Sequence, residues 1–378
     1  MGKQVSQKKI LFIIGTRPEL IKTIPVYLSF KNYDKYNVAL CNTGQHKEMV
    51  SDLLKFYKIK PEFNLNVMEE GQTLEGLTIK LFKKLSNVYD IYKPELVFVQ
   101  GDTTTALVGA MQAFYKKVPV AHIESGLRTY DIYSPFPEEI NRQLISRIAS
   151  LNFAPTIKAK ENLIREGIHS SRIYVVGNTV IDALFLTLNI VEKLDINLVY
   201  HKIKYKPKNK QYILITTHRR ENFGENLKNI CLAIKSLADK FKDIDFVFPV
   251  HPNPNVRKIV YKYLMGIDNI FIIEPVIYPY FIFLMANCYF IMTDSGGIQE
   301  EAPSLKKPVL VLRDKTERIE AEEKGLVKVV GTNPENIIEE ASKLILNPDE
   351  YKKFIGASNP YGDGKASKRI LQIIEDYL

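Results

Sequence analysis

Acidic residues follow two of the apolar runs in this sequence, at the points where buried strands are expected to end. Asp102 comes shortly after the run 95–100, and Glu124 comes directly after the run 118–123. Ligands of parallel α/β sheets bind beyond the carboxyl ends of the strands, so these positions are candidates for a site. Carboxylates placed there can transfer protons, while neighbouring arginines can hold an anion.

A second candidate is the pair Gly296-Gly297, which separates the apolar run 289–292 from helix-forming residues. This order predicts a strand, a tight turn and the first turn of a helix. Two residues without Cβ let a ligand approach the backbone, and the free N–H groups of the first helical turn favour a phosphate. Ser295, Gly296 and Gly297 are therefore predicted to take a phosphate or pyrophosphate, and Glu301 a sugar hydroxyl. A glycine pair alone more often only makes a turn.

The polar residues that follow the predicted strands, Glu138 and His251 among them, also have purely structural interpretations. Asp102 could cap the helix that follows it, and Glu138 could be a first-turn carboxylate with Arg128 or Arg142 as its surface partner. His251, before a proline, could be a turn residue. The functional interpretation gains weight because carboxylates, a histidine and several arginines all follow strands whose ends the fold brings to one edge.

The chain alternates short β-branched runs with helical patterns, which predicts parallel sheets covered by helices on both faces. A lysine-rich, weakly apolar junction near 190–210 separates two such series and predicts two doubly wound domains. The predicted strands are 10–14, 36–41, 95–100, 118–123, 151–154 and 173–176, followed by 212–215, 246–250, 270–273, 289–292, 309–312 and 326–329.

Composition limits the class of protein. The chain has 378 residues, 46% of them hydrophobic, and a net charge of +9, which suits two cores and an anionic partner. The lysines of 201–210 are interpreted as a solvated connection, and without a recognisable motif no nucleic-acid partner is expected. Three widely spaced cysteines indicate a reducing compartment and suggest no metal site.

Neither a membrane span nor a signal peptide is expected. No apolar stretch reaches the roughly 18 residues that a bilayer requires, and the polar segment 1–9 runs directly into a strand. Residues 1–6 match a permissive myristoylation pattern but are interpreted as a frayed leader. The segment 15–19 lacks the GxGxxG spacing and no GxxxxGK[ST] is present, so neither tightly bound NAD nor P-loop phosphoryl transfer is supported.

Eight motifs follow one another in order along the chain. They are Gly-Thr-Arg-Pro-Glu (15–19) with Lys22, Thr-Gly-Gln-His (43–46), Gln-Gly-Asp-Thr-Thr (100–104), His-Ile-Glu-Ser-Gly-Leu-Arg-Thr (122–129), Pro-Glu-Glu (137–139), Gly-Asn-Thr-Val-Ile-Asp (177–182), Thr-His-Arg-Arg-Glu-Asn (217–222) and Asp-Ser-Gly-Gly-Ile-Gln-Glu-Glu (294–301). Together they resemble the motifs of the non-hydrolysing UDP-N-acetylglucosamine 2-epimerases of bacteria and archaea. The resemblance extends from about residue 10 to residue 364.

The resemblance implies a glycosyltransferase-B-like architecture, with two Rossmann-like domains facing across a cleft. The implied limits are 1–185 and 186–365, with a helix at 366–378 returning to the first domain. It also implies a cytoplasmic homodimer that needs no organic cofactor or metal. Such an enzyme converts UDP-GlcNAc reversibly to UDP-ManNAc, a precursor of cell-surface polysaccharide.

The implied chemistry explains the residue types. The C2 proton is not next to a carbonyl and is barely acidic, so UDP must begin to leave before a carboxylate can remove it. Asp102, Glu124 and Glu138 match the family's catalytic carboxylates, with the roles of acid and base left open, and His218 matches a histidine near the leaving diphosphate. The residues implied to hold the nucleotide sugar are Arg17, Lys22, Phe281, Ser295, Gly296, Gly297, Glu301 and Arg318.

The sequence departs from the family pattern beside Glu124, in the loop 316–320 and in a set of activator-binding residues. The common His-Val-Glu-Ala-Gly is His-Ile-Glu-Ser-Gly at 122–126, which is a mild change. Ile319 replaces a proline in the loop 316–320, which leaves that loop less pre-set. In some bacterial members an activating second UDP-GlcNAc is bound by residues that correspond to Gln45, Arg219 and His251. Two further residues of that set, an arginine and a glutamine, are here Gly71 and Glu48.

Three alternatives to this epimerase stay open. An epimerase of a UDP-diacetamido-uronic sugar shares the motifs, although segments 127–129 and 133–139 favour the simple N-acetylhexosamine type. A glycosyltransferase on the same fold needs an acceptor cleft and has no need of three carboxylates. A non-catalytic nucleotide-sugar sensor predicts loss of proton-handling residues, all of which are present.

Overall fold

The structure is a computed structural model that describes residues 7–45, 47–209 and 211–378. The expected leader 1–6, His46 and Lys210 lie outside the described residues, as does the side chain of Glu48. Contacts divide the chain into two compact units. The first comprises Met1–Ala183 and Tyr361–Leu378, and the second Leu184–Pro360.

The first unit is built on a seven-stranded parallel sheet of order β3-β2-β1-β4-β5-β6-β7. Its strands are β1 (Lys8–Ile14), β2 (Tyr36–Asn42), β3 (Phe63–Asn64), β4 (Leu96–Gln100), β5 (Val120–Ile123), β6 (Leu151–Ala154) and β7 (Ile173–Val175). Its helices are α1 (Arg17–Lys31), α2 (Lys47–Phe56), α3 (Leu74–Tyr92), α4 (Thr104–Tyr115), α5 (Glu138–Ile148), α6 (Ile157–Arg165) and α16 (Ala366–Tyr377), with the short turn η1 (Ser170–Arg172).

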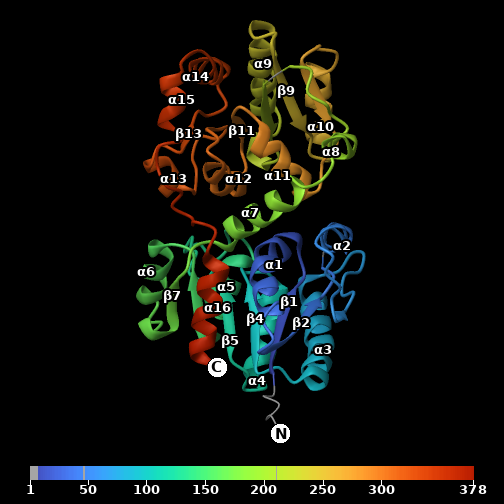
Figure 1. Cartoon of the computed structure of the whole chain (residues 1–378), viewed down its shortest axis with the longest axis vertical. Helices are drawn as coiled ribbons and strands as arrows, with labels where there is room; N and C mark the ends of the chain where they lie inside the picture. Colours follow the sequence, from blue (N-terminus) through green and yellow to red (C-terminus); the bar gives the residue numbers. More distant parts are fainter. Residues whose placement is uncertain (1–6, 46, 210) are drawn as a thin grey trace. The chain divides into compact units, whose positions relative to one another are not determined.

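Alternating side chains of the central strands fill a core on each face of this sheet. Phe12 of β1 stacks on Phe98 of β4, with ring centroids 4.5 Å apart, and Phe30 of α1 packs edge-on against both rings. On the opposite face Leu11 and the residues in phase with it pack against α3 and α4. Helix α16 lies beside α1, so the end of the chain packs onto this first unit (Figure 1).

The second unit has a six-stranded parallel sheet of order β10-β9-β8-β11-β12-β13. Its strands are β8 (Gln211–Thr216), β9 (Ile244–Pro249), β10 (Ile270–Ile273), β11 (Ile291–Thr293), β12 (Val309–Val311) and β13 (Val327–Val329). Its helices are α8 (Ile196–Ile203), α9 (Glu225–Lys240), α10 (Pro254–Leu264), α11 (Tyr278–Asn287), α12 (Gly296–Glu301), α13 (Ile319–Glu323), α14 (Pro334–Leu346) and α15 (Pro348–Lys353), with the short turns η2 (Arg220–Asn222) and η3 (Ala302–Leu305). Helix α7 (Thr179–Val191) runs from the first unit into the second.

Several details differ from the sequence-based expectation. The short strand β3 was not predicted, and the strand predicted for 289–292 starts at Ile291. The predicted junction near 190–210 is partly helical, because Asp195 caps α8 by accepting the N–H of Asn197 at 2.9 Å while Val199 and Ile203 are buried. The predicted strand 118–123 starts at Val120, since Pro119 has no N–H group to offer a ladder. The domain limits at 185/186 and 365/366 stay predictions.

Each sheet has a point where the strand order reverses, which is where α/β proteins bind ligands. In the first unit this point lies between β1 and β4, and in the second between β8 and β11. The loops that follow these strands begin at residues 15, 101, 217 and 294. No helix in the described residues is both long and apolar enough to span a membrane.

Candidate functional site

In the first unit, Asp102 lies just beyond the carboxyl end of β4 and pairs with Arg142 of α5. The distance between Asp102 Oδ2 and Arg142 Nη2 is 2.5 Å. Burial and the negative charges of Glu124 and Glu138 raise the pKa of Asp102, and the positive charges of Arg142 and Lys22 oppose that rise. Asp102 therefore holds its proton more readily than an exposed aspartate, as a group that exchanges protons requires.

Glu124 follows β5 in a backbone conformation that few residues other than glycine adopt, with φ of +64°. Both of its carboxylate oxygens lie 2.6 Å from Lys22 Nζ, and the amide groups of Gln100 and Asn178 donate to it as well. Its side chain is 6% exposed. Strain of this kind is tolerated where it aims a functional side chain, which fits a catalytic carboxylate.

The structure separates Glu138 from the partners that the structural interpretation gave it. Arg128 pairs with Glu166 at 2.6 Å, and Arg142 pairs with Asp102. Glu138 itself begins α5, half-buried and close enough to raise the pKa of Asp102. The alternative role of Asp102 as a helix cap is also wrong, because Thr103 Oγ1 caps α4 by accepting the N–H of Ala106 at 3.0 Å.

Arg17 and Lys22 both lie on α1, after the carboxyl end of β1. Arg17 is the first residue of the helix and is exposed, whereas Lys22, one turn later, is half-buried against Glu124. The first unit thus gathers five of the predicted residues around β1, β4 and β5.

In the second unit, His218 is held by the buried Asp294. The Nδ1 atom of His218 lies 3.1 Å from Asp294 Oδ1, and Asp294 also accepts the backbone N–H groups of His218 and Arg219 and the amide of Asn222. Although burial alone would raise the pKa of Asp294, these hydrogen bonds and the charge of His218 hold it below the usual value. The ring of His218 is thereby oriented with its Nε2 side remaining for a ligand.

The turn that follows β11 brings two guanidinium groups close to Gly296. A Cβ added at Gly296 would lie 3.4 Å from Arg318 Nη2, 3.5 Å from Arg219 Nη2 and 2.8 Å from Glu317 Oε1. Ser295 precedes α12, and Gly297, the second residue of that helix, is exposed. The absence of a side chain at 296 keeps open the space in which these cations could meet an anion.

Glu301, Phe281 and Arg318 lie around the same turn. Glu301 is buried at the end of α12 and accepts a hydrogen bond from the Tyr278 hydroxyl, while Phe281 is half-buried one turn further along α11. Arg318 forms an ion pair with Glu300 at 2.5 Å. Ile319, which stands where the family has proline, is the exposed first residue of α13.

The three residues predicted for an activating ligand fall in different units. Gln45 belongs to the first unit, where it accepts a hydrogen bond from Thr105. Arg219 and His251 belong to the second, where Arg219 pairs with Glu317 and the His251 ring stacks on His218 with centroids 6.1 Å apart.

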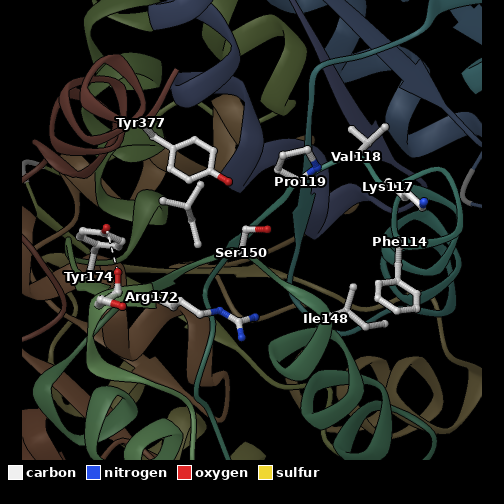
Figure 2. Close-up of a pocket in the computed structure, with 11 residues that line it drawn as sticks. Phe114, Lys117, Val118, Pro119, Ile148, Ser150, Arg172, Tyr174 and Tyr377 are labelled. Atoms are coloured by element: carbon white, nitrogen blue, oxygen red, sulfur yellow. Dashed lines mark hydrogen bonds between the residues drawn. The ribbon is translucent and has the colours of Figure 1, made fainter.

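A pocket of about 700 Å³ lies at the opposite edge of the first sheet, at the amino ends of β5, β6 and β7 (Figure 2). Arg172, Ser150, Phe114 and Tyr377 are among its lining residues. Within the described part of the chain none of the predicted site residues lines it, so it is separate from the strand-end groups.

Three residues that matter to this geometry were not predicted from the sequence. The sequence suggests Arg142 only as a surface partner of Glu138, and it indicates no partner for Asp294. Glu139 is fully buried and accepts the backbone N–H groups of Thr129 and Tyr130, each at 3.1 Å, so it fixes the loop before α5. The eight motifs include Glu139 and Asp294 but not Arg142, and spacing alone does not say which side chain turns inward.

The fold and these two groups of residues define the class of protein. It is an α/β protein with two doubly wound parallel sheets, related in fold to the glycosyltransferase-B-like enzymes, and the predicted fold class is confirmed. The sequence profile described as UDP-N-acetylglucosamine 2-epimerase matches residues 29–375. The chain belongs to this family of isomerases, which confirms the resemblance.

Similar proteins cover nearly the whole chain. A UDP-N-acetylglucosamine 2-epimerase of Campylobacter jejuni is 50% identical over 376 residues, with 97% of each chain covered. The crystal structure of UDP-GlcNAc 2-epimerase from Neisseria meningitidis bound to UDP-GlcNAc has 46% identity and a TM-score of 0.87, covering 97% of this chain and all of that one. The enzyme of Methanocaldococcus jannaschii in complex with UDP-GlcNAc and UDP has 36% identity and a TM-score of 0.77, covering 97% and 99%.

Proposed function

We propose that this enzyme interconverts UDP-GlcNAc and UDP-ManNAc by eliminating UDP and adding it back. The relatives named above are UDP-GlcNAc 2-epimerases, and two of the solved structures contain UDP-GlcNAc. The observation that carries the proposal is the pair of carboxylates Asp102 and Glu124, each beside a cation at the carboxyl ends of adjacent strands. Such paired groups suit the removal of a proton and its return.

The first bond to break is the one between C1 of the sugar and the oxygen of the diphosphate. UDP leaves with the electron pair, and its growing negative charge needs cations and N–H donors. In the second unit we assign this role to His218, Arg318 and the turn of Ser295, Gly296 and Gly297; Arg17 of the first unit would add a further charge. Glu301 would accept a hydrogen bond from the ribose, and Phe281 would contact the nucleotide.

Departure of UDP puts positive charge on C1 and acidifies the C2 proton. A carboxylate then takes that proton, the C–H electrons form the C1–C2 double bond, and a glycal results. Return of UDP to C1, with a proton delivered to the other face of C2, gives the epimer. Asp102, Glu124 and Glu138 are our candidates for these transfers, and Lys22 holds Glu124 in place. The two steps balance without an oxidant or reductant.

The same proposal extends to the cell and the assembly. We place the enzyme in the cytoplasm, in the supply of cell-surface polysaccharide, and the three buried free cysteines fit a reducing compartment. We also propose a homodimer. Helices α3, α4 and α5 pack in one layer and carry the exposed apolar residues Ile79, Phe114 and Leu144, which a second copy could cover.

The function is tested by incubating the protein separately with UDP-GlcNAc and UDP-ManNAc and separating the products by anion-exchange chromatography. We expect both reactions to approach the same ratio without added NAD or metal. Conversion of only a diacetamido-uronic UDP-sugar would identify the related epimerase instead. Release of UDP only in the presence of an acceptor would identify a glycosyltransferase.

A further inference from the structure

Glu19 is a buried carboxylate to which the proposed reaction assigns no role. It is the third residue of α1 and is 1% exposed. Its Oε2 atom accepts the backbone N–H groups of Gly15 at 3.1 Å and Thr16 at 2.7 Å, and its Oε1 atom accepts the hydroxyl of Thr103 at 2.7 Å. A single side chain therefore joins the loop after β1 to the loop after β4.

Both loops carry residues of the proposed site directly beside these hydrogen bonds. Thr16 precedes Arg17, and Thr103 follows Asp102. The loop after β1 is also packed tightly, because a Cβ at Gly15 would come within 2.5 Å of the hydroxyl oxygens of Thr43 and Thr105. Neither loop can shift without disturbing the carboxylate that joins them.

The partners of Glu19 are all neutral. Ionisable side chains on the elements around it are Arg17 and Lys22 on α1 and Asp102 after β4, and within the described residues none forms an ion pair with Glu19. An uncompensated buried carboxylate is unfavourable, and burial raises the pKa of Glu19 to about 7. A neutral side chain would be less costly to bury, so the contribution of this carboxylate lies in the geometry of its hydrogen bonds.

We propose that Glu19 is a positioning residue that sets the separation of the diphosphate-binding Arg17 from the proton-transferring Asp102. The inference rests on the proposed function of those two residues. Glu19 makes no contact with the sugar in this account. It acts by holding two loops in register, and misplacement of a reacting group by about 1 Å can reduce a rate by roughly 10²-fold.

The hydrogen-bond directions supply a sharp distinction between position and charge. In Glu19→Gln the amide oxygen can still accept the N–H groups of Gly15 and Thr16, while the amide nitrogen can donate to Thr103 Oγ1. The glutamine thus preserves all three links without the charge. In Glu19→Ala all three are lost.

Asp245 offers a matched control in the second unit. It is fully buried, near the amino end of β9, and accepts the backbone N–H groups of Lys208 and Asn209 and the hydroxyl of Tyr205. It also accepts the side-chain amide of Asn209 at 2.8 Å. Like Glu19 it accepts two backbone N–H groups and a hydroxyl, with this one further donor, at the edge of the sheet away from the proposed site. Asp245→Ala should lower stability without changing kcat.

The experiment measures kcat and KM for UDP-GlcNAc in the wild type, Glu19→Gln, Glu19→Ala and Asp245→Ala, together with amide hydrogen exchange of the loops 15–17 and 101–104. We expect Glu19→Ala to lose roughly 10²-fold in kcat and to exchange faster in both loops. Glu19→Gln should keep most of the wild-type kcat and slow exchange. Unchanged kcat in folded Glu19→Ala, or a Glu19→Gln variant as impaired as Glu19→Ala, overturns the positioning role.

A second pair of variants covers the case in which Glu19→Ala does not fold. Thr103→Val removes the hydrogen bond to Glu19 together with the cap of α4, whereas Thr103→Ser keeps both. We expect kcat to fall and the loop 15–17 to exchange faster only in Thr103→Val; equal kcat in both variants contradicts the proposal. If the wild type itself converts no UDP-GlcNAc, the proposed function has failed. The exchange rates of the two loops then still decide whether Glu19 joins them.

Discussion

The two units carry different charges at the carboxyl ends of their strands, although both are doubly wound parallel sheets. The first presents Asp102 and Glu124, each attended by a cation, whereas the second presents His218, Arg219 and Arg318. The carboxylate that holds His218 is buried beneath it. In the function proposed above, the same architecture serves proton transfer in one unit and anion binding in the other, and the loops decide which.

Two buried carboxylates sharpen this contrast. Glu19 in the first unit and Asp294 in the second each accept backbone N–H groups from a strand-end loop. Burial raises the pKa of Glu19 to about 7, while the pKa of Asp294 lies below its usual value. The difference follows from their partners, because Glu19 meets only neutral donors and Asp294 meets a histidine that can carry charge. As pH rises, the ionisation of Glu19 therefore lowers the stability of the fold, whereas the ionisation of Asp294 raises it.

The largest expected effect separates proton transfer from binding. Asp102→Asn and Glu124→Gln should each lower kcat by roughly 10²- to 10⁴-fold, the usual contribution of a general acid or base. The affinity for UDP, measured by calorimetry, should stay close to that of the wild type, because UDP is assigned chiefly to the second unit. Glu95→Gln is the control, since Glu95 is an exposed carboxylate of the same unit that pairs with Lys8. A similar loss of UDP affinity in these variants would contradict the assignment of proton transfer to the first unit and UDP binding chiefly to the second.

The charge on Glu19 should make the stability of the fold depend on pH. Its folded pKa of about 7 exceeds the ordinary 4.5, so the folded state loses stability as pH rises from about 4.5 to 7 and regains none above that. One pKa unit corresponds to about 1.4 kcal/mol, which puts the penalty at no more than about 3.5 kcal/mol. Glu19→Gln should raise the urea midpoint at pH 8 and have little effect near pH 4.5. A lower midpoint at pH 8 would show that the carboxylate stabilises the fold.

Asp294→Asn should have the opposite effect. Because the folded pKa of Asp294 lies below its usual 3.8, the ionised group stabilises the fold above that pH, and this stability is lost as pH falls through the folded value. In Asp294→Asn, some of the N–H groups that donate to Asp294 lose their acceptor. This loss should lower the free energy of unfolding at pH 8 by about 1.5–3 kcal/mol. Urea unfolding measures the loss, and calorimetry should show weaker binding of UDP because His218 is no longer held. Equal stabilities at pH 8 would contradict the role given to Asp294.

The smallest predicted effect is that of a methyl group at Gly296. A Cβ there would meet Glu317 and two arginine side chains, all of which can move aside, so the fold should tolerate Gly296→Ala. The methyl group would nevertheless occupy the space assigned to a phosphate, and we expect the affinity for UDP to fall about tenfold, or about 1.4 kcal/mol. Gly356→Ala is the matched control, because the φ of Gly356, like that of Gly296, is not positive. Gly266 has a positive φ, so an alanine there would strain the backbone. Unaltered UDP affinity in Gly296→Ala would place the phosphates elsewhere.

Much of the fold and the candidate residues could be predicted because their signals are local. The apolar runs that end at Gln100 and Ile123 became β4 and β5 within two residues, and the Gly296-Gly297 turn begins a helix as expected. Residues that directly follow neighbouring parallel strands lie at the same edge of the sheet. Asp102 and Glu124 are therefore expected at that edge, independently of the paths of the loops. Binding and catalytic roles for these residues stay predictions.

What the sequence did not reveal is how distant side chains pair. Arg142 lies 40 positions from Asp102 and could equally have pointed to Glu138 on its own helix; the path of the loop before α5, fixed by Glu139, decides between them. The hold of Asp294 on His218 likewise depends on β8 and β11 being neighbours, which strand order sets and spacing does not. The helix within 190–210 is not evident from the sequence, because the surrounding lysines outnumber Val199 and Ile203, the two buried apolar residues of α8.

In the proposed reaction the C2 proton is removed and returned during epimerisation. Proton NMR of the enzyme with UDP-GlcNAc in deuterated water, without added metal or NAD, tests it most directly. We predict growth of a UDP-ManNAc signal to a stable ratio, with deuterium entering C2 of both sugars and neither change in Asp102→Asn. UDP-GlcNAc that stays unconverted and unlabelled, while the folded protein still binds UDP, would contradict the account.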